Sequence, residues 1–516
     1  MKKQAVGRPG FSRLIILLKK SLKKQSGKGL KKQSGKSLEK QSGKGLKKIW
    51  KQSGESLKKR RSKRIQMTKK REMDLINGSL GDKIVMFALP LAATGILQQL
   101  FNAADIAVVG RFVGKHAMAA VGSNAPIVGL MVNLFIGISM GTNVVIARFT
   151  GEGNKENIRK SVHTAIVLAV CGGLVMGVLG ELLTVPLLRL MGVPAEIYDM
   201  AVLYMRVYLT GMPVILLYNF ESAIFRSQGD TRTPLMCLTI SGLVNVALNV
   251  FFVVVVGMTV NGVALATVIS NLISSSLLFY FLCRTDSAVH VDFRELKIHT
   301  DVLGHMLQIG VPAGLQSMVF SLANICVQSA INSLGADVVA GSSAAFNIEI
   351  FSYFLLNSFG QACTTFVGQN YGAGKPERCR RTLRLCLIQD LAVVAAAAAL
   401  ILTFGTQILG IFNTDPAVAE FGMIRMRYIL IAHLFSVIVE VVSGAMRGYG
   451  FSAWPALMSL FGICGIRITW VYTVFRATPT FATLMLVYPV SIAATAAAVT
   501  ISYMYLQRTR LQRMEI

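Results

Sequence analysis

The sequence predicts an all-α integral membrane protein with about twelve transmembrane helices, arranged as two six-helix lobes related by an internal repeat. Three observations support this prediction: an apolar composition, a series of long apolar runs, and motifs that recur at one spacing. Of the 516 residues, 53% are hydrophobic and 15% are charged, and the mean hydropathy is +0.56. A soluble chain carries roughly 25% charged residues. So few charged side chains cannot cover a globular surface, which indicates a lipid bilayer as the surrounding solvent.

The segment 1–66 differs in composition from the rest of the chain. It contains 23 Lys and Arg and two acidic residues, so it accounts for +21 of the formal net charge of +28. The motif Lys-Gln-Ser-Gly occurs four times between Lys24 and Gly54. A segment so rich in Lys, Gly and Ser buries too little apolar surface to fold. We expect residues 1–66 to form a disordered basic arm that docks on anionic lipid or has no transport role, with Met67 as an alternative start.

Long apolar runs separated by short polar loops follow Met73. Each run exceeds the roughly 20 residues that a helix needs to cross a bilayer. The predicted spans are 84–109, 116–143, 160–184, 200–224, 234–256, 260–283, 303–333, 337–366, 384–410, 418–445, 455–475 and 480–506.

Lys and Arg are unevenly distributed between alternate loops. One set of loops and span ends, from Arg148 to Arg447, has fifteen of them, and the other set has only Arg111, Lys115, Arg189 and Arg476. Basic loops are retained on the cytoplasmic side of a membrane. With an even number of spans, we expect a multi-pass protein of the plasma (inner) membrane with both termini in the cytoplasm.

Several motifs of the first half recur in the second half at a nearly constant offset. The matching pairs are Gly151 and Gly372, Arg226 and Arg447, Gly229 and Gly450, Pro90 and Pro312, and Asn102 and Asn324. This repeat predicts an N-lobe (67–296, spans 1–6) and a C-lobe (297–516, spans 7–12). Six spans per half give both halves the same orientation, with a pseudo-twofold axis along the membrane normal and a substrate path between them. The architecture favours a carrier over an enzyme.

Asp105 is the most informative ionisable residue of the predicted spans. It lies in the first span, fifteen residues after Pro90, which removes a backbone hydrogen bond and lets the helix bend. Ionisable groups at this depth usually face a cavity or a partner. A carboxylate there can exchange a proton or bind a cation, so Asp105 is a candidate for ion coupling. The alternative is a carboxylate at the outer interface, solvated or capping a loop.

Three polar residues of the fifth and sixth spans are candidate partners of Asp105. Asn245 and Asn249 are one helical turn apart and share a face, and Thr267 follows in the next span. Their side-chain oxygens could join Asp105 around a Na⁺ ion. The alternative is that they form interhelical hydrogen bonds, as polar residues in membrane helices often do.

Three glutamates are further candidates for transport: Glu221 in the fourth span, Glu349 in the eighth and Glu440 in the tenth. Acidic groups in a transport path suit cationic substrates. The alternative is structural ion pairing with arginines of the spans. The arginines considered for such pairs are Arg206, Arg425 and Arg427.

Three other charged residues at span ends are predicted to lie outside the substrate site. Arg226 and Arg447 are expected to anchor at headgroup level or to lock the two lobes together, and Asp390 is expected at the interface.

The motifs that contain these residues resemble the multidrug and toxic-compound extrusion (MATE) family, bacterial type. The matching stretches are 78–84, Leu89-Pro90, 101–105, Gly110, 226–234 and 368–374. The resemblance covers residues 78–506. It implies two six-helix lobes in a V and drug export driven by Na⁺ or H⁺. It also implies that Asp105 is the coupling carboxylate of the N-lobe, that Pro90 marks a bend, and that Asn245, Asn249 and Thr267 occupy partner positions.

Two departures from the family pattern bear on coupling. Bacterial members often carry Asp at the position of Asn249, and the amide here removes a titratable charge while leaving Na⁺ coordination possible. The acidic residue that some members have in the seventh helix finds no match near Phe320. The repeat counterpart of Asp105 is Val327, so the sequence predicts coupling in the N-lobe alone, by Na⁺ or H⁺.

We therefore expect a secondary active antiporter that exports amphipathic or cationic small molecules in exchange for Na⁺ or H⁺. It should act in the bilayer as a monomer, without a cofactor or a nucleic-acid partner. The alternative is a flippase for a lipid-linked precursor, which tends to need a strongly cationic cavity, whereas the cavity candidates here are mainly acidic or neutral. An integral-membrane enzyme is not expected, because the sequence has no HExxH motif and no Cys/His cluster.

Overall fold

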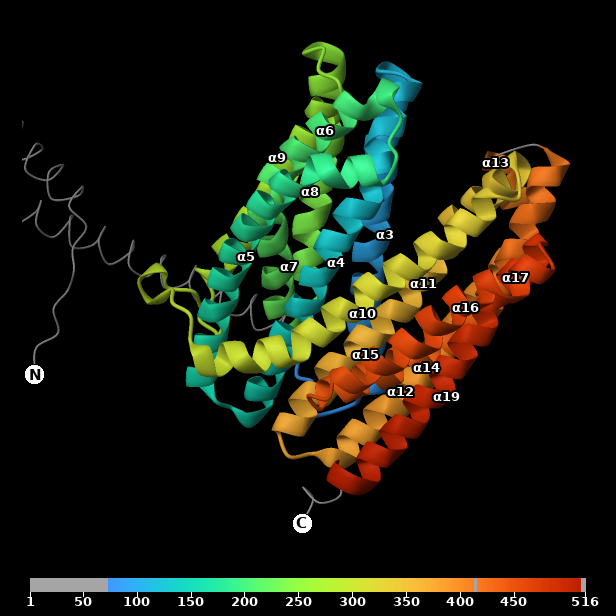
Figure 1. Ribbon diagram of the computed structural model, residues 1–516. Coiled ribbons are helices and arrows are strands. Elements are labelled where there is room, and N and C mark those ends of the chain that lie inside the picture. The colour runs from blue at the N-terminus through green and yellow to red at the C-terminus, as the bar shows by residue number, and fades with distance from the viewer. Residues whose placement is uncertain (1–72, 413–414, 512–516) are drawn as a thin grey trace, which may run out of the picture. The chain divides into compact units, whose positions relative to one another are not determined.

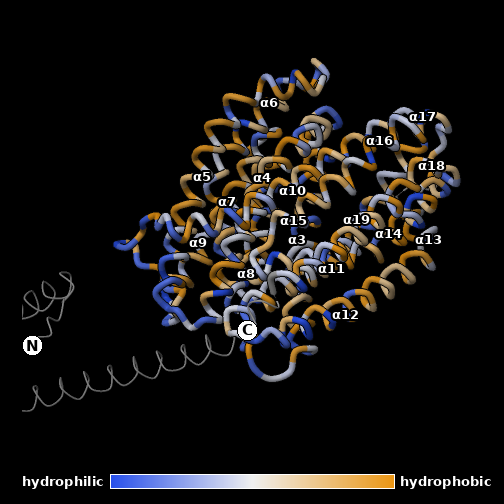
Figure 2. Tube along the Cα trace, turned by 60° about the horizontal axis from the view of Figure 1, so that its bottom comes forward, coloured by the Kyte–Doolittle hydropathy of each residue, from blue (hydrophilic) through white to orange (hydrophobic). Residues whose placement is uncertain are grey.

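The computed structural model describes residues 73–412 and 415–511, and within these residues every regular element is a helix. The predicted basic arm, residues 1–66, lies outside the described residues. Eleven described helices are long and apolar enough to cross a membrane, and a bent helix pair brings the number to twelve. The predicted all-α membrane architecture is confirmed. Figure 2 shows apolar residues along the helices and hydrophilic residues gathered at the connecting loops.

The first six spans make up the N-lobe. They are α3 (Gly81–Phe112), α4 (Lys115–Glu152), α5 (Lys155–Leu190), the pair α6 (Ala195–Thr210) and α7 (Met212–Ser227), α8 (Arg232–Val250) with the π-helical turn η1 (Phe251–Val255), and α9 (Val260–Leu282). A short 3₁₀ turn, η2 (Phe293–Glu295), lies in the connection to the second half.

The last six spans make up the C-lobe. They are α10 (Thr300–Asn332), α11 (Ala336–Gly372), α12 (Pro376–Thr403), α14 (Pro416–Gly448), the series α15 (Ala453–Ser459), η3 (Leu460–Gly465), α16 (Ile466–Tyr472) and α17 (Val474–Ala477), and α19 (Val487–Leu506) ending in η4 (Gln507–Leu511). Two short helices, α13 (Gly405–Phe412) and α18 (Phe481–Met485), lie in the connections.

The fourth predicted span, 200–224, is not one straight helix. It is broken at Gly211 into α6 and α7, whose axes differ by 51°. Pro213 lies in the first turn of α7 and has no backbone N–H for the preceding turn, which explains the break. A Cβ on Gly211 would lie 2.5 Å from Cγ2 of Val268, so the bend also brings the backbone close to α9.

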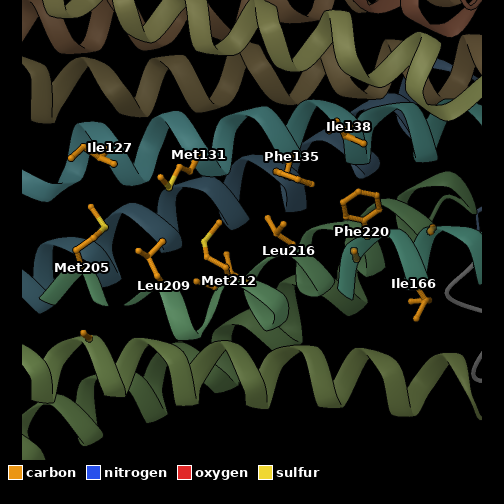
Figure 3. Close-up of a cluster of buried hydrophobic side chains, with 14 of the residues drawn as sticks. Ile127, Met131, Phe135, Ile138, Ile166, Met205, Leu209, Met212, Leu216 and Phe220 are labelled. Atoms are coloured by element: carbon orange, nitrogen blue, oxygen red, sulfur yellow. The ribbon is translucent and has the colours of Figure 1, made fainter. Parts of the chain in front are cut away.

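The apolar core of the N-lobe lies between α4, α5, α6 and α7. Figure 3 shows side chains from these helices meeting in one cluster. The labelled members are Ile127, Met131, Phe135 and Ile138 on α4, Ile166 on α5, Met205 and Leu209 on α6, and Met212, Leu216 and Phe220 on α7.

The first helix of each half packs at its start against residues of the other half. The start of α3, including Ile84 and Phe87, lies in an apolar cluster with C-lobe residues, and the Phe87 ring meets the Phe366 ring edge-on at 5.6 Å between centroids. In the same way Met306 and Ile309, near the start of α10, belong to the N-lobe core. The first helix of each half therefore ties the two lobes together.

The lobes approach closely where glycines of α4 meet glycines of α10. A Cβ on Gly137 would lie 2.1 Å from the backbone nitrogen of Gly314, and a Cβ on Gly141 would lie 2.8 Å from that of Gly310. Small residues spaced four apart let membrane helices pack backbone to backbone. This contact has no room for a side chain on either helix.

We expect Gly137→Ala to destabilise the protein by roughly 2 kcal/mol, because overpacking a rigid backbone contact forces the helices apart. Gly122→Ala, on the same helix with no atom within 4 Å of its added Cβ, is the matched control. There Ala should be neutral or stabilising by up to about 1 kcal/mol. Thermal unfolding in detergent measures both, and equal melting temperatures would contradict the close packing.

The lobes are closed against each other at the end of the helices that carries the basic loops, which we call the basic end. Asn143 of α4 and Thr365 of α11, which are repeat counterparts, exchange hydrogen bonds of 3.1 and 3.2 Å. Nearer the loops, Gln369 Nε2 donates to the carbonyl of Ser227 at 2.6 Å. In Figure 1 the lobes separate toward the opposite end, in the direction of α6 and α13.

Candidate functional site

The structure brings Asp105 together with the three polar residues predicted as its partners. Asp105 lies on α3, Asn245 and Asn249 on α8, and Thr267 on α9, and Asp105 is 7% exposed. One carboxylate oxygen accepts a hydrogen bond from Nδ2 of Asn249, and the other accepts one from Oγ1 of Thr267 at 3.1 Å. Nδ2 of Asn249 also donates to Oδ1 of Asn245 at 3.2 Å. We call these four residues the Asp105 cluster.

Close packing of α3 against α8 holds the cluster together. A Cβ on Gly242 would lie 1.8 Å from the Phe101 ring, so glycine is required for this approach. Phe101 precedes Asp105 by one helical turn, and Gly242 precedes Asn245 by about one turn. The π-helical turn η1 begins two residues after Asn249, and such turns often occur at functional sites.

The Asp105 cluster is rich in oxygen atoms and incompletely paired. Oδ1 of Asn249 is buried and has no hydrogen-bond partner among the described residues. A buried polar atom without a partner is costly, and it can be satisfied by a bound ion. Carboxylate, amide and hydroxyl oxygens are the ligands of hard cations, and a carboxylate is also a proton acceptor. The donor set therefore fits Na⁺ or a proton.

Pro90 lies inside α3, which continues as a helix on both sides of it. Oγ1 of Thr94 donates to the Pro90 carbonyl at 2.8 Å, one turn further along. The use of Pro90 as a bending point stays a prediction.

A cavity of about 750 Å³ lies between the two lobes. Its walls come from α3, α4 and α7 of the N-lobe and from α10, α11, α14, η3, α16 and α19 of the C-lobe. The lining residues of α4 extend only to Asn143, where the closure at the basic end begins. Asp105 is not among the lining residues.

Both glutamates of the cavity wall are paired with arginine. Glu349 accepts two hydrogen bonds from Arg425, at 3.1 and 2.6 Å, and the side chains of Arg425 and Glu349 are only 6% and 7% exposed. Glu440 lies 3.5 Å from Nη2 of Arg447. For Glu349 the structure matches the ion-pair alternative with Arg425. Neither Glu349 nor Glu440 therefore has an unpaired carboxylate at the cavity wall.

Glu221, the third predicted glutamate, does not line the cavity. It is fully buried in the N-lobe, where one carboxylate oxygen accepts a hydrogen bond from Ser275 at 2.9 Å. Arg206, considered above as an ion-pair partner, instead pairs with Glu181 at 2.8 Å on the exposed surface.

The structure places the three charged residues that were predicted at span ends. Arg226 and Arg447, expected as headgroup anchors or as locks between the lobes, both line the cavity between the lobes, and each lies in the last turn of its helix. The lock between the lobes stays a prediction. Asp390 is fully buried, not interfacial, because α12 begins at Pro376 and places it several turns inside the helix.

The cavity is also more basic than expected. Four arginines and two glutamates line it, where mainly acidic or neutral residues were predicted. The arginine that sequence reasoning missed is Arg467, on α16. Its position inside the predicted span 455–475 was a signal, because an ionisable residue at such depth usually faces a cavity.

Comparison with known proteins agrees with this architecture. A family model described as MatE matches residues 90–251 and 312–473, so the two matches begin at Pro90 and at its counterpart Pro312 and confirm the internal repeat. The "Probable multidrug resistance protein YoeA" of Bacillus subtilis is 29% identical over 74% of this chain and 84% of its own. The "FAD transporter" of Shewanella oneidensis is 26% identical over 67% of this chain and 77% of its own.

A solved structure has the same fold. It is described as the "outward-facing conformation of a multidrug resistance MATE family transporter of the MOP superfamily". It is 22% identical and covers 85% of this chain and 99% of its own, with a TM-score of 0.79.

Proposed function

Because the chain belongs to the MatE family, we propose that it is an antiporter that exports amphipathic small molecules in exchange for Na⁺ or H⁺ by alternating access. The observation that carries this proposal is the Asp105 cluster, a buried carboxylate surrounded by amide and hydroxyl oxygens. An exporter of this kind needs a site that binds an ion in one conformation and releases it in another.

Alternating access is supported by the contacts between the lobes. The cavity lies between them, and the basic end is closed by polar contacts such as Asn143 with Thr365 and Gln369 with Ser227. Individual hydrogen bonds contribute only about 1 kcal/mol, so these contacts can be exchanged for others. A second state, open at the basic end, requires that they separate.

The uneven distribution of basic loops supports an orientation with the basic end and both termini in the cytoplasm. The plasma membrane is then the site of export, with the lipid bilayer as the surrounding medium. All the residues that line the cavity belong to a single chain, and the proposal includes action as a monomer.

The charge of the cavity wall argues against the cationic substrates that the glutamates suggested. An ion-paired carboxylate attracts a cation less strongly than an unpaired one, and both glutamates of the wall are paired with arginine. One relative is named a multidrug resistance protein and another an FAD transporter, and FAD carries phosphate groups. The proposed function therefore includes amphipathic substrates that are not cations.

The excess of arginine also supports the alternative function, a flippase for a lipid-linked precursor. A cationic cavity between two lobes suits the phosphate of such a lipid. The number of arginines in the wall, four, is the specific observation that favours this second candidate.

Transport into proteoliposomes under separately imposed Na⁺ and H⁺ gradients tests the proposed function. Three fluorescent probes cover the charge classes: ethidium, riboflavin and riboflavin 5′-phosphate. We expect at least one probe to accumulate inside the proteoliposomes against its own concentration gradient when an outward gradient of Na⁺ or of H⁺ is imposed. Gradient-independent movement of a labelled phosphatidic acid between leaflets, with no probe accumulated, would contradict antiport and support the flippase.

A further inference from the structure

The C-lobe position that corresponds to the Asp105 cluster has the opposite polarity. At the offset shared by the two family matches, Val327 corresponds to Asp105, and Arg467 corresponds to Asn245. Val327 is fully buried in an apolar cluster. The second half therefore has an apolar side chain where the first half has the carboxylate, and a guanidinium where the first half has the amide of Asn245.

Arg467 is held by neutral groups alone. It is 3% exposed, its Nη1 donates to Oδ1 of Asn324 at 2.7 Å, and its Nε donates to Oγ of Ser491 at 3.3 Å. Its guanidinium carbon lies 4.4 Å from the centroid of the Tyr488 ring. These contacts orient the guanidinium group, and none of them supplies a negative charge.

The positive charge of Arg467 is uncompensated within the described part of the chain, where no carboxylate forms an ion pair with it. Arginine stays protonated in proteins, so the charge cannot be lost by titration. A buried charge without a partner is strongly destabilising. Because Arg467 lines the cavity, a ligand can supply the missing charge.

The surroundings of Arg467 do not offset its positive charge. The guanidinium carbon of Arg425 lies 6.0 Å from the centroid of the same Tyr488 ring. The carboxylate of Glu349 forms an ion pair with Arg425 and is therefore not available to Arg467. On the N-lobe side Arg226 also lines the cavity, and its Nε has no hydrogen-bond partner among the described residues. The two paired arginines are neutralised, which leaves Arg467 and Arg226 as the unneutralised charges of the wall.

We propose that the substrate carries an anionic group, a phosphate or a carboxylate, which Arg467 binds in the C-lobe wall of the cavity. Such groups accept two parallel hydrogen bonds from a guanidinium. The apolar part of the substrate packs on the aromatic wall of Phe320, Phe346 and Phe354. This inference rests on the proposed function, since it takes the cavity as the transport path. The inference places the two bound charges in separate lobes. The coupling cation binds at the Asp105 cluster of the N-lobe, and the anionic group of the substrate binds at Arg467 of the C-lobe.

Riboflavin and riboflavin 5′-phosphate test the inference, because they differ only in the phosphate. Binding is measured by fluorescence with the full chain in nanodiscs of phosphatidylcholine. We expect the phosphate form to bind at least about tenfold more tightly than riboflavin, the effect of one charge-assisted hydrogen-bonded contact. In Arg467→Gln the affinities for the two flavins should differ by no more than about twofold. Arg467→Lys keeps the positive charge but cannot donate two parallel hydrogen bonds, so it should retain part of the preference.

Arg189→Gln is the matched control, since Arg189 is exposed at the end of α5 and away from the cavity. It makes the same change of charge and should keep the full preference. Retained riboflavin binding and an unchanged melting temperature show that the Arg467→Gln protein is folded. Equal binding of the two flavins to the wild-type protein, or an undiminished preference in Arg467→Gln, overturns the inference.

Competition by phosphatidic acid in the nanodisc distinguishes the two sources of the anion. Displacement of riboflavin 5′-phosphate by this lipid, lost in Arg467→Gln, supports a lipid phosphate. Binding that the lipid does not displace supports a soluble organic anion. Binding needs no ion gradient, so the binding test is independent of the transport test. If the wild-type protein prefers riboflavin 5′-phosphate in binding but shows no gradient-driven transport, the antiport proposal is overturned and the inference about Arg467 stands.

Discussion

Asp105→Asn is expected to reduce gradient-driven transport by at least about tenfold while the protein stays folded. The change removes one negative charge and keeps the shape of the side chain, so the contacts with Asn249 and Thr267 can still form. Loss of one charge-assisted contact weakens cation binding by roughly 10- to 100-fold. An antiporter that cannot bind its ion cannot use the ion gradient.

Two measurements separate coupling from stability in this variant. Proteoliposome transport gives the coupled rate, and thermal unfolding with increasing NaCl or at decreasing pH reports ion binding directly, because a ligand of the folded state raises the melting temperature. The ion that stabilises the wild-type protein should not stabilise Asp105→Asn. Asp199→Asn, at an exposed carboxyl group of α6, should behave as wild type in both. Undiminished coupled transport in Asp105→Asn would refute the assignment.

Glu349→Gln is expected to destabilise the folded protein by about 3–5 kcal/mol, because it leaves the buried guanidinium of Arg425 without its countercharge. The same change in the exposed pair, Glu181→Gln opposite Arg206, should cost less than about 1 kcal/mol. The contrast arises because the Glu181–Arg206 pair lies at the surface, with about half of each side chain exposed, whereas the Glu349–Arg425 pair is enclosed in the interior.

The double variant Glu349→Gln/Arg425→Gln tests the reason for this effect. Removing both charges should recover much of the lost stability, since no uncompensated charge remains. Thermal and denaturant unfolding in detergent measure the single and double variants. A Glu349→Gln protein that is as stable as Glu181→Gln but no longer transports would instead assign Glu349 a direct role in transport.

Much of the fold could be predicted from the sequence because a bilayer imposes a local rule. A span must be apolar over roughly 20 residues, and this property can be recognised without knowledge of any neighbour. The Asp105 cluster was also predictable, because the spacing of Asn245 and Asn249 places them on one face of a helix. Thr267 was a candidate from its place in the next span, and the resemblance to a known family implied the same partner position for it.

Residues whose role depends on distant partners could not be assigned in this way. Nothing local to Glu349 shows that Arg425, 76 residues away, neutralises it. The cavity-facing positions of Arg226 and Arg447 depend on how the two lobes meet, and so the sequence alone leaves headgroup anchoring open for both. The break at Gly211 likewise depends on how α6 and α7 pack in the fold, where their axes differ by 51°.

The sequence by itself determined the helical membrane architecture, the duplication and the position of the candidate coupling carboxylate. Span length, residue spacing and motif recurrence are properties of the chain alone. Only the tertiary structure decided the electrostatics of the cavity, because the net charge of a site depends on which groups lie within a few ångströms of one another. It showed that Arg467, the counterpart of Asn245, is hydrogen-bonded by neutral neighbours alone. The two halves thus share a fold and differ in the charge that they present.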